Sequence, residues 1–336
     1  MSAHDVFFVQ SLFDLVCRKG QIIAIKHWDV SRQDPDRDLV KFDRPGFGNY
    51  DSTANSWRIA INFMPIPLPS FIYGTAWKKD ATAPLVRAAV NAGFKAIDTA
   101  NQPRHYSEAL VGEALAALVA EGVSRDSLFL QTKFTPLNGH DQRIPYDPRA
   151  SLTSQVNQSF ESSLQNLKTD RVDSYLLHGP YSYPGLGRED WEVWSAIEAI
   201  HNSGRAGMIG VSNVNALQVS ALIDSAKIKP MVVQNRCFAN RGWDRDVRRI
   251  CRQHGIMYQG FSLLTANPYV LRHPRVRSIA ERLGVDTPQV IFRFAMQAGM
   301  VPLTGTTSLE HMKEDLKVSD IEVPAEEVKL IESIEE

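Results

Sequence analysis

The feature that most limits the fold of this chain is an alternation, from about Phe71 onward, of short apolar runs with segments of helical periodicity. The apolar runs begin at Phe71, Phe94, Leu128, Val172, Met208, Met231, Gly255 and Met300. The helical segments carry apolar stripes, such as Val156, Phe160, Ser163, Leu164 and Leu167. Eight strand–helix units imply parallel strands, which close into a barrel with the helices outside. We therefore predict an α/β fold, a single-domain (β/α)8 TIM barrel over residues 57–336.

A doubly wound open sheet is the alternative architecture. Such sheets usually carry a glycine-rich fingerprint after the first strand. The nearest motif, Gly185-Leu186-Gly187, lacks a third glycine and follows no strand end. The barrel is therefore the favoured prediction.

The first 56 residues differ from the rest of the chain. An apolar start is followed by a charged, turn-rich segment from Ser31 to Ser56, and neither part shows a clear period. This composition predicts a poorly ordered N-terminal extension, although a wrongly assigned start of the chain is also open. Residues Trp57 to Pro69 alternate loosely and are a candidate for a small plug under the barrel.

Composition excludes several classes of partner. The 37 Lys and Arg residues nearly balance the 38 Asp and Glu residues, so we expect no nucleic-acid or membrane-surface partner. The cysteines Cys17, Cys237 and Cys251 form no CxxC pair, which argues for a reducing compartment and against a zinc site. No apolar run is long enough to span a bilayer. We expect a cytoplasmic monomer or weak oligomer.

Three of the apolar runs end on an ionisable residue. These residues are Asp98, Lys133 and His178, and Tyr106 lies in the loop after the first of them. In a parallel β/α barrel the carboxyl ends of the strands converge on one mouth, where such folds place their chemistry. The sequence therefore predicts that these four side chains gather into a proton-donating site.

Six segments in this order resemble the aldo-keto reductase family, over about Phe71 to Ile334. They are Gly93 to Ala100, Thr132-Lys133, Leu176 to His178, Gly210 to Val214, Gln234 after Met231-Val232-Val233, and Gly305 to Ser308. The segments Pro136 to Pro145 and Asp98 to Pro103 are most similar to fungal members. The resemblance implies a barrel that reduces carbonyls with a nicotinamide cofactor, and a catalytic tetrad of Asp98, Tyr106, Lys133 and His178.

Elementary chemistry agrees with those roles. Reducing a carbonyl requires hydride on carbon and a proton on the emerging alkoxide. Tyr106 would be the acid, and the Lys133 ammonium would lower its pKa from the reference value of ~10. Asp98 would anchor Lys133, and His178 would orient the substrate oxygen. The loop Asn101 to His105 is longer than usual in the family, and His105, the immediate neighbour of Tyr106, is a weak rival donor.

The resemblance also implies a cofactor site. Ser212, Asn213 and Gln234 would bind the carboxamide, and the ring of Phe261 would stack on the nicotinamide. Ser262 and Leu263 would lie near the pyrophosphate. Gly305, Thr306 and Thr307 precede a helix that begins near Leu309, where backbone N–H groups cradle phosphate.

The adenosine end departs from the pattern of members selective for the 2′-phosphate. Gly305 and His311 align with the usual Lys and Arg, and Asp315 aligns with a usual Asn. Lys313 is the one strong cation nearby, although phosphate recognition favours Arg forks or Lys charges. We expect NADPH from the resemblance, with NADH possible.

The substrate side is predicted to be open. Gly179 follows His178 where many relatives carry a bulky aromatic, and no tail follows the helix that ends near Ile334. Trp77, Phe134 and Tyr181 are candidate pocket walls with Gly179. These features predict a bulky or varied small-molecule carbonyl substrate.

Three hypotheses for function remain. The first is an NAD(P)H-dependent carbonyl reductase. The second is a non-catalytic barrel that binds the cofactor and acts as a regulatory subunit. The third is a metal-dependent hydrolase or lyase, which needs paired ligands at several strand ends, whereas only His178 and Asp98 are available. We expect no metal.

Overall fold

The computed structural model describes residues 14–18, 21–25, 50–51, 56–57 and 68–334. The chain divides into two compact units, Met1–Met64 and Pro65–Glu336. In the first unit β1 (Asp14–Arg18) pairs antiparallel with β2 (Gln21–Ile25), and β3 (Tyr50–Asp51) pairs with β4 (Ser56–Trp57). The predicted poor order of residues 1–56 and the predicted plug over Trp57 to Pro69 concern residues that mostly lie outside the described ones.

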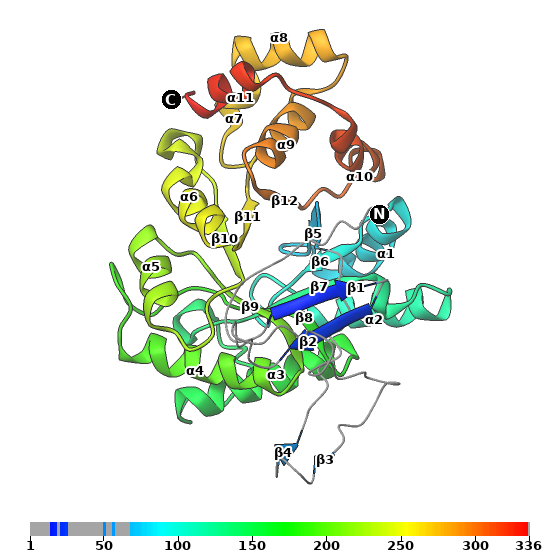
Figure 1. Cartoon of the computed structure of the whole chain (residues 1–336). Coiled ribbons are helices and arrows are strands. Elements are labelled where there is room, and N and C mark those ends of the chain that lie inside the picture. Colours follow the sequence, from blue (N-terminus) through cyan, green and yellow to red (C-terminus); the bar gives the residue numbers. More distant parts are fainter. Residues whose placement is uncertain (1–13, 19–20, 26–49, 52–55, 58–67, 335–336) are drawn as a thin grey trace. The chain divides into compact units, whose positions relative to one another are not determined.

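The second unit is a closed barrel of eight parallel strands, as predicted (Figure 1). The strands are β5 (Ile72–Gly74), β6 (Ala96–Asp98), β7 (Phe129–Phe134), β8 (Val172–Leu177), β9 (Ala206–Ser212), β10 (Val232–Arg236), β11 (Met257–Phe261) and β12 (Val301–Thr304). Their order around the barrel follows the sequence, and β12 closes the ring on β5 through the pair Leu303 and Ile72. Each strand begins within two residues of its predicted start.

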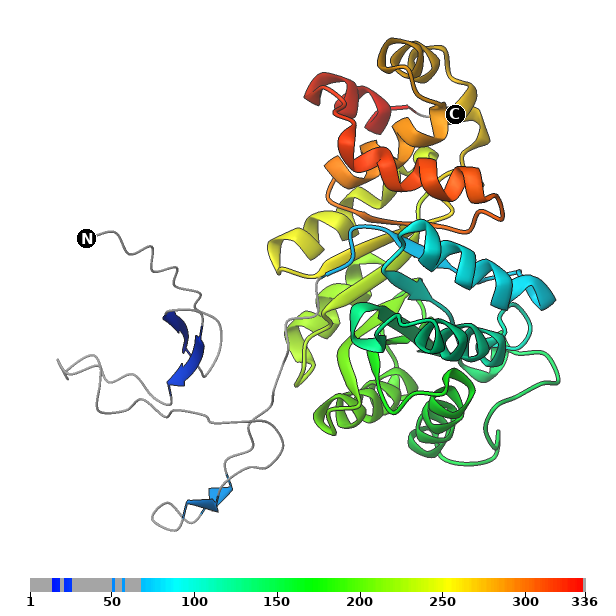
Figure 2. The same cartoon turned by 90° about the vertical axis from the view of Figure 1, so that its right-hand side faces the viewer.

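Helices surround the strands in both views (Figure 2). They are α1 (Thr82–Ala92), α2 (Glu108–Ala120), α3 (Leu152–Leu167), α4 (Arg188–Asn202), α5 (Ala216–Ser225), α6 (Arg245–Gln253), α7 (Pro268–Arg272), α8 (Pro274–Leu283), α9 (Thr287–Gln297), α10 (Leu309–Leu316) and α11 (Ala325–Glu332). Short 3-10 turns lie at Lys79–Ala81, Arg125–Ser127, Leu137–Gly139, Ala239–Asp244 and Lys317–Asp320. No helix within the described residues combines the length and apolar composition that crossing a membrane requires.

Helix α3 shows how the sequence specifies these elements. The Ser151 side chain caps its start by accepting a hydrogen bond from Ser154 N, and left-handed Lys168 ends it. Its predicted apolar stripe is buried, including Phe160, whose burial contributes roughly 1.5–3 kcal/mol. In helix α1, Val86 and Val90 are buried, whereas Leu85 is only partly buried.

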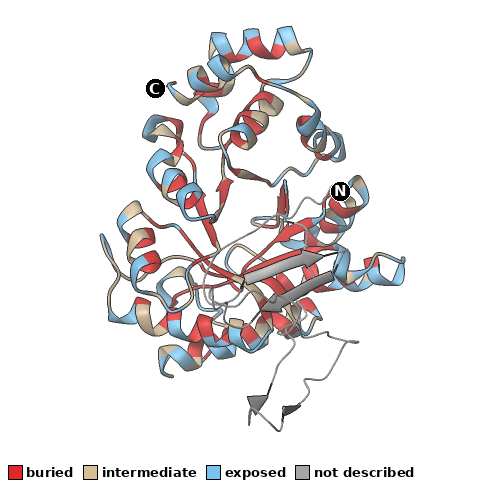
Figure 3. Cartoon of the chain, in the orientation of Figure 1, coloured by how far each residue is buried: buried red, intermediate tan, exposed pale blue. Residues whose placement is uncertain are grey.

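Successive side chains of each strand alternate between two cores, one between the barrel and the helices and one inside the barrel. Side chains that point outward pack against the helices in the large cluster that contains Ile97, Leu130 and Phe134. Side chains that point inward fill the barrel, beginning with a small apolar cluster around Ala96 and Phe129. Figure 3 shows the buried strands inside helices whose outer faces are exposed. Because the side-chain period of a strand is two, Asp98 and Lys133 follow these inward positions into the barrel.

Candidate active site

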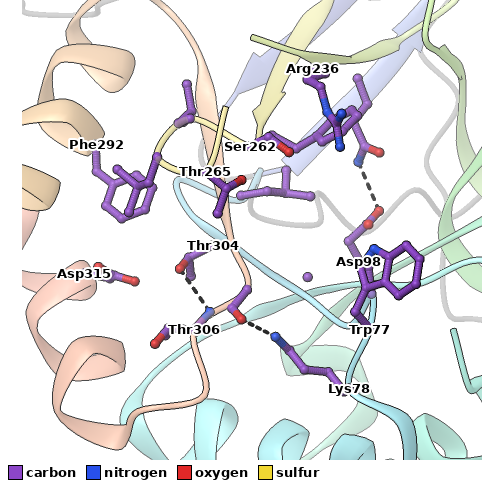
Figure 4. A pocket seen from close by; sticks show the side chains of 18 of the residues that line it. Trp77, Lys78, Asp98, Arg236, Ser262, Thr265, Phe292, Thr304, Thr306 and Asp315 are labelled. Atoms are coloured by element: carbon purple, nitrogen blue, oxygen red, sulfur yellow. Dashed lines mark hydrogen bonds between the residues drawn. The ribbon is translucent and has the colours of Figure 1, made fainter. Parts of the chain in front are cut away.

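A cavity of about 720 Å³ opens at the carboxyl ends of the strands. Asp98, Tyr106 and His178 are among its lining residues. In Figure 4, Asp98 lies next to Trp77 on one side of the cavity, and Phe292 and Asp315 lie on the opposite side. Three of the four predicted tetrad residues thus face one cavity. The fourth, Lys133, is fully buried behind Asp98.

The strand ends of β6 and β7 hold a buried ion pair. Lys133 Nζ lies 2.7 Å from both carboxylate oxygens of Asp98 and donates a third hydrogen bond of 2.8 Å to the carbonyl of Thr99. Burial lowers the pKa of Lys133, and the Asp98 carboxylate opposes this shift. All three ammonium protons therefore have an acceptor, which fixes the lysine in place.

Tyr106 lies between Lys133 and His178. Its ring centroid is 5.4 Å from Lys133 Nζ and 5.9 Å from the His178 ring. Tyr106 is partly buried in the cavity wall, and burial is the main cause that raises its pKa, followed by the negative charge of Asp98. Sequence reasoning expected Lys133 to lower this pKa, but the direction here is the reverse, because burial raises the pKa and the Asp98 charge acts in the same direction. The phenol of Tyr106 therefore keeps its proton.

His178 is held as a neutral imidazole. Burial lowers its pKa well below the usual value, and the charges of Lys133, His105 and His140 act in the same direction. Its Nδ1 lies 2.7 Å from the hydroxyl of Thr135. When that hydroxyl donates to Nδ1, the imidazole proton must reside on Nε2, where it can be donated to a substrate oxygen.

Replacing Thr135 with valine tests this arrangement. We expect kcat to fall about tenfold, because His178 loses the partner that fixes its tautomer while its surroundings keep nearly the same volume. The matched control is Thr153→Val, at an exposed position of α3. A lower steady-state kcat together with an unchanged cofactor affinity would support this role, and an unchanged kcat would contradict it.

The mouth of the cavity carries a second aromatic pair. Trp77 and His105 stack with ring centroids 4.0 Å apart, and His105 Nδ1 lies 2.7 Å from Gln102 Oε1. Burial lowers the pKa of His105, with Arg104 acting in the same direction and Asp141 against it. Trp77 is 67% exposed and lines the cavity, so it offers a flat apolar wall to a ligand.

The predicted carboxamide corner forms where β9 and β10 end side by side. Ser212 Oγ donates a hydrogen bond of 2.6 Å to the backbone carbonyl of Gln234. The side-chain amide of Asn213 donates to the His178 carbonyl at 2.8 Å and to Ser212 Oγ at 3.1 Å. Ser212 and Gln234 line the cavity, and Asn213 lies beside it, outside the lining.

The phosphate end combines a helix start with a cation. The loop from Gly305 to Ser308 leads into α10, and Ser308 Oγ accepts a hydrogen bond of 3.3 Å from His311 N. Lys78 Nζ donates to the carbonyl of Gly305. A helix N-terminus beside an ammonium group suits a pyrophosphate. With the ring of Phe261 and the amides near Gln234, these groups fit a nicotinamide dinucleotide.

Three non-glycine residues at the mouth have a left-handed backbone. They are Trp77, Asn213 and Ser262, with φ of 65°, 57° and 56°. Each such conformation costs about 1–3 kcal/mol and persists only where the surroundings impose it. All three follow barrel strands, so the strain is concentrated at this end of the barrel.

Most of the predicted binding residues reach the cavity. Its lining includes Trp77, Ser212, Gln234, Phe261, Ser262, Leu263, Gly305, Thr306, His311 and Asp315. Asn213, Thr307, Phe134, Gly179 and Tyr181 are not part of the lining. Phe134 is fully buried against Tyr146, because it follows inward-facing Lys133 and must face outward. Tyr181 packs against the outer core.

Sequence reasoning missed several lining residues, among them Lys78, Arg236, Asp286 and Glu314. Lys78 could have been found, because it follows Trp77 in the loop after the first strand. Asp286 lies at the start of α9, whereas the sequence prediction selected residues that follow the strands. Within the described residues, no group of three His, Cys, Asp or Glu side chains could hold a metal ion.

Comparisons with known proteins agree with this geometry. The chain is 30% identical over 253 residues to an uncharacterized oxidoreductase, YtbE, of Bacillus subtilis, covering 75% of this chain and 82% of that one. It is 28% identical to glyoxal reductase of the same organism, covering 74% and 82%. An aldo-keto reductase from a deep-sea metagenome, MGS-M4, shares the fold with a TM-score of 0.69 at 24% identity, covering 80% and 92%. Residues 71–336 match the profile of the Aldo/keto reductase family, so this chain belongs to that family and is an NAD(P)H-dependent oxidoreductase of carbonyl groups.

Proposed function

We propose that Tyr106 supplies the proton when this protein reduces an aldehyde or ketone to an alcohol. The observation that carries the proposal is the packing of the Tyr106 phenol between the buried Asp98–Lys133 pair and neutral His178. When bound, the reduced nicotinamide supplies the hydride. His178 would hold the carbonyl oxygen by a hydrogen bond, so that the developing alkoxide lies next to the phenol.

The proton moves from Tyr106 to the alkoxide. Because burial raises the pKa of Tyr106, the phenol keeps its proton until a strong base forms beside it. An alkoxide is more basic than a phenolate, so this transfer is favourable. The Lys133 ammonium, 5.4 Å from the ring centroid, would stabilise the phenolate that remains.

The residues proposed to hold the cofactor are those already located along the cavity. Ser212, Asn213 and Gln234 would bind the carboxamide, and Phe261 would stack on the ring. Ser262, Leu263 and the loop Gly305 to Thr307 would hold the pyrophosphate, with Lys78 adding charge that the sequence did not suggest.

The substrate would enter between the stacked pair Trp77–His105 and Arg236. The lining at this end is aromatic and open, which supports a bulky or varied carbonyl substrate. Glyoxal, which the name of one relative suggests, is a suitable small test compound. Cys237 and Cys251 are buried and form no disulfide, which supports the proposed cytoplasmic location.

The cofactor preference is proposed from charge. The resemblance favours NADPH, but the far end of the cavity carries Asp286, Glu314 and Asp315 beside His311. Burial raises the pKa of Asp315 to about 6, so this carboxyl group is mainly ionised at neutral pH and above. Carboxylates repel a 2′-phosphate and accept hydrogen bonds from a ribose hydroxyl. We therefore propose that NADH binds at least as tightly as NADPH.

A charge reversal tests this preference. Glu314→Lys should shift the ratio of NADPH to NADH affinity about tenfold toward NADPH, because it exchanges a repelling charge for an attracting one. Glu310→Lys makes the same change one turn earlier on α10, outside the cavity lining, and should leave the ratio unchanged. Fluorescence titrations with both cofactors measure the ratio. An equal shift in both variants would show that only the net charge matters.

Turnover tests the function itself. Purified protein is mixed with NADH or NADPH and an aldehyde, and the loss of reduced cofactor and the formation of alcohol are followed. The alternative, a non-catalytic regulatory barrel, predicts binding of the cofactor without alcohol formation. The named relatives reported above are reductases or oxidoreductases, which gives that alternative no support.

A further inference from the structure

Three buried glutamines form a polar layer across the barrel, directly below the proposed reaction centre. Gln131 is the register partner of Asp98 on the neighbouring strand, and Gln259 is the register partner of Gln234. The side chains of these two strand pairs meet inside the barrel, where all four residues are at most 3% exposed. Inward layers of such barrels are usually bulky and apolar, so a polar layer here needs a reason.

The carboxylate determines the orientation of every amide in this layer. Asp98 Oδ1 lies 2.7 Å from Gln131 Nε2 and 3.0 Å from Gln234 Nε2. An ionised carboxylate only accepts hydrogen bonds, so both amides must turn their nitrogen toward it. Each of these nitrogens then donates its second proton to Gln259 Oε1, at 2.7 and 2.9 Å.

The third amide of the layer belongs to Gln259, and both of its protons are also donated. Gln259 Nε2 donates to Gln131 Oε1 at 3.0 Å and to the sulfur of Met257 at 3.4 Å. All amide protons of the three glutamines therefore have acceptors. Of their three oxygens, only Gln234 Oε1 accepts no hydrogen bond from any residue in the part of the chain that the structure describes.

We propose that Gln131 and Gln259 are positioning residues that lock Gln234 with its carbonyl oxygen toward the cavity, as an acceptor for the amide N–H of the nicotinamide carboxamide. Gln234 lines the cavity, and both of its amide protons are engaged below. The inference rests on the proposed cofactor site. It adds that the charge of Asp98 sets the hydrogen-bond polarity that the ligand meets, by acting on Gln234 directly and through Gln259, which Gln131 holds in place.

The first experiment compares two reduced cofactors that differ only at this group. One carries the natural carboxamide, and the other carries an acetyl group, which keeps the carbonyl but has no N–H to donate. The full-length protein should bind the carboxamide form about tenfold more tightly, because the acetyl form leaves a buried acceptor unpaired. Affinities come from fluorescence titration without substrate, so the result does not depend on turnover.

The second experiment removes the hydrogen bond that Gln259 accepts from Gln234. Gln259→Met keeps the volume but removes one of the two acceptors of Gln234 Nε2. Only the Asp98 carboxylate then holds the amide, so the orientation of Gln234 is less firmly fixed. The preference for the carboxamide should then fall about threefold or more. Gln131→Met/Gln259→Met replaces both members of the reciprocal pair with apolar side chains and should recover thermal stability but not the preference. Gln155→Met, which removes another buried glutamine bonded to Pro148 and Ala150, is the control.

The outcomes separate this inference from the proposed function. Equal affinity of the wild-type protein for the two forms, or an unchanged preference in Gln259→Met, overturns the positioning role while leaving the reductase function intact. A purely structural role predicts that the double variant regains the wild-type preference together with its stability. Failure of the wild-type protein to bind either form would overturn the proposed cofactor site itself.

Discussion

Tyr106→Phe should lower kcat by a factor of about 10² to 10⁴, the range that general acids contribute. The variant keeps the ring that lies against His178 and Lys133 and removes only the proton that the alkoxide would take. Cofactor affinity and melting temperature should therefore change little. The measurement is a set of single-turnover rates with a saturating aldehyde.

The control for this prediction is Tyr183→Phe, at a position that is 85% exposed and outside the cavity lining. It should leave kcat unchanged. If Tyr106→Phe kept most of its activity while His105→Gln lost it, the proton donor would be the neighbouring histidine, which also lines the cavity.

Lys133→Met should have the second large effect, on stability as well as rate. Removing one partner of a buried ion pair leaves the Asp98 carboxylate without its cation, which typically costs about 3–5 kcal/mol. The phenolate of Tyr106 also loses its nearest stabilising charge, so kcat should fall further than stability alone explains. Urea unfolding and steady-state rates, both measured well below the melting temperature, separate the two effects.

Two further variants sharpen the interpretation of Lys133. Lys95→Met removes an exposed lysine just before β6 and should change neither quantity. Asp98→Asn/Lys133→Met removes both charges, and its Asn side chain can still accept from Gln131 and Gln234. This double variant should regain most of the stability and remain slow. Recovery of kcat in the double variant would mean that the ion pair supports the fold and not the chemistry.

The sequence predicted the barrel because its signal is repeated. Eight apolar runs that alternate with helical segments leave few alternatives, and strand register then follows from closure of the ring. The same rule placed Asp98, Lys133 and His178 at one end, since each terminates such a run. Local sequence patterns were therefore enough to predict that these three side chains gather at one end of the barrel.

Other features depend on which face of a strand a residue occupies. Phe134 was expected at the pocket, but the period of two sends it outward once Lys133 points inward. The pairing of Gln131 with Gln259 joins strands that are not neighbours in the barrel, and no local pattern reveals it. Its polarity depends further on the charge of Asp98, which only the three-dimensional arrangement brings beside both glutamines.

Electrostatics also required the structure. Proximity of an ammonium suggested a lowered pKa for Tyr106, but burial of the phenol and the Asp98 charge reverse the direction. Asp286 precedes α9 and Glu314 lies on α10, and only the fold brings both into the lining of the cavity with Asp315. The expectation of NADPH consequently rested on resemblance alone.

The central claim is that this protein reduces a carbonyl with hydride from the nicotinamide and a proton from Tyr106. Its most direct test traces the hydride. The protein is given an aldehyde and reduced nicotinamide deuterated at the transferable position on either face, and the alcohol is analysed by mass spectrometry. We predict that deuterium from one face appears on the carbinol carbon with the wild-type protein, and far more slowly with Tyr106→Phe. Alcohol without deuterium from either face, or no alcohol from well-folded protein that binds the cofactor, would contradict the account.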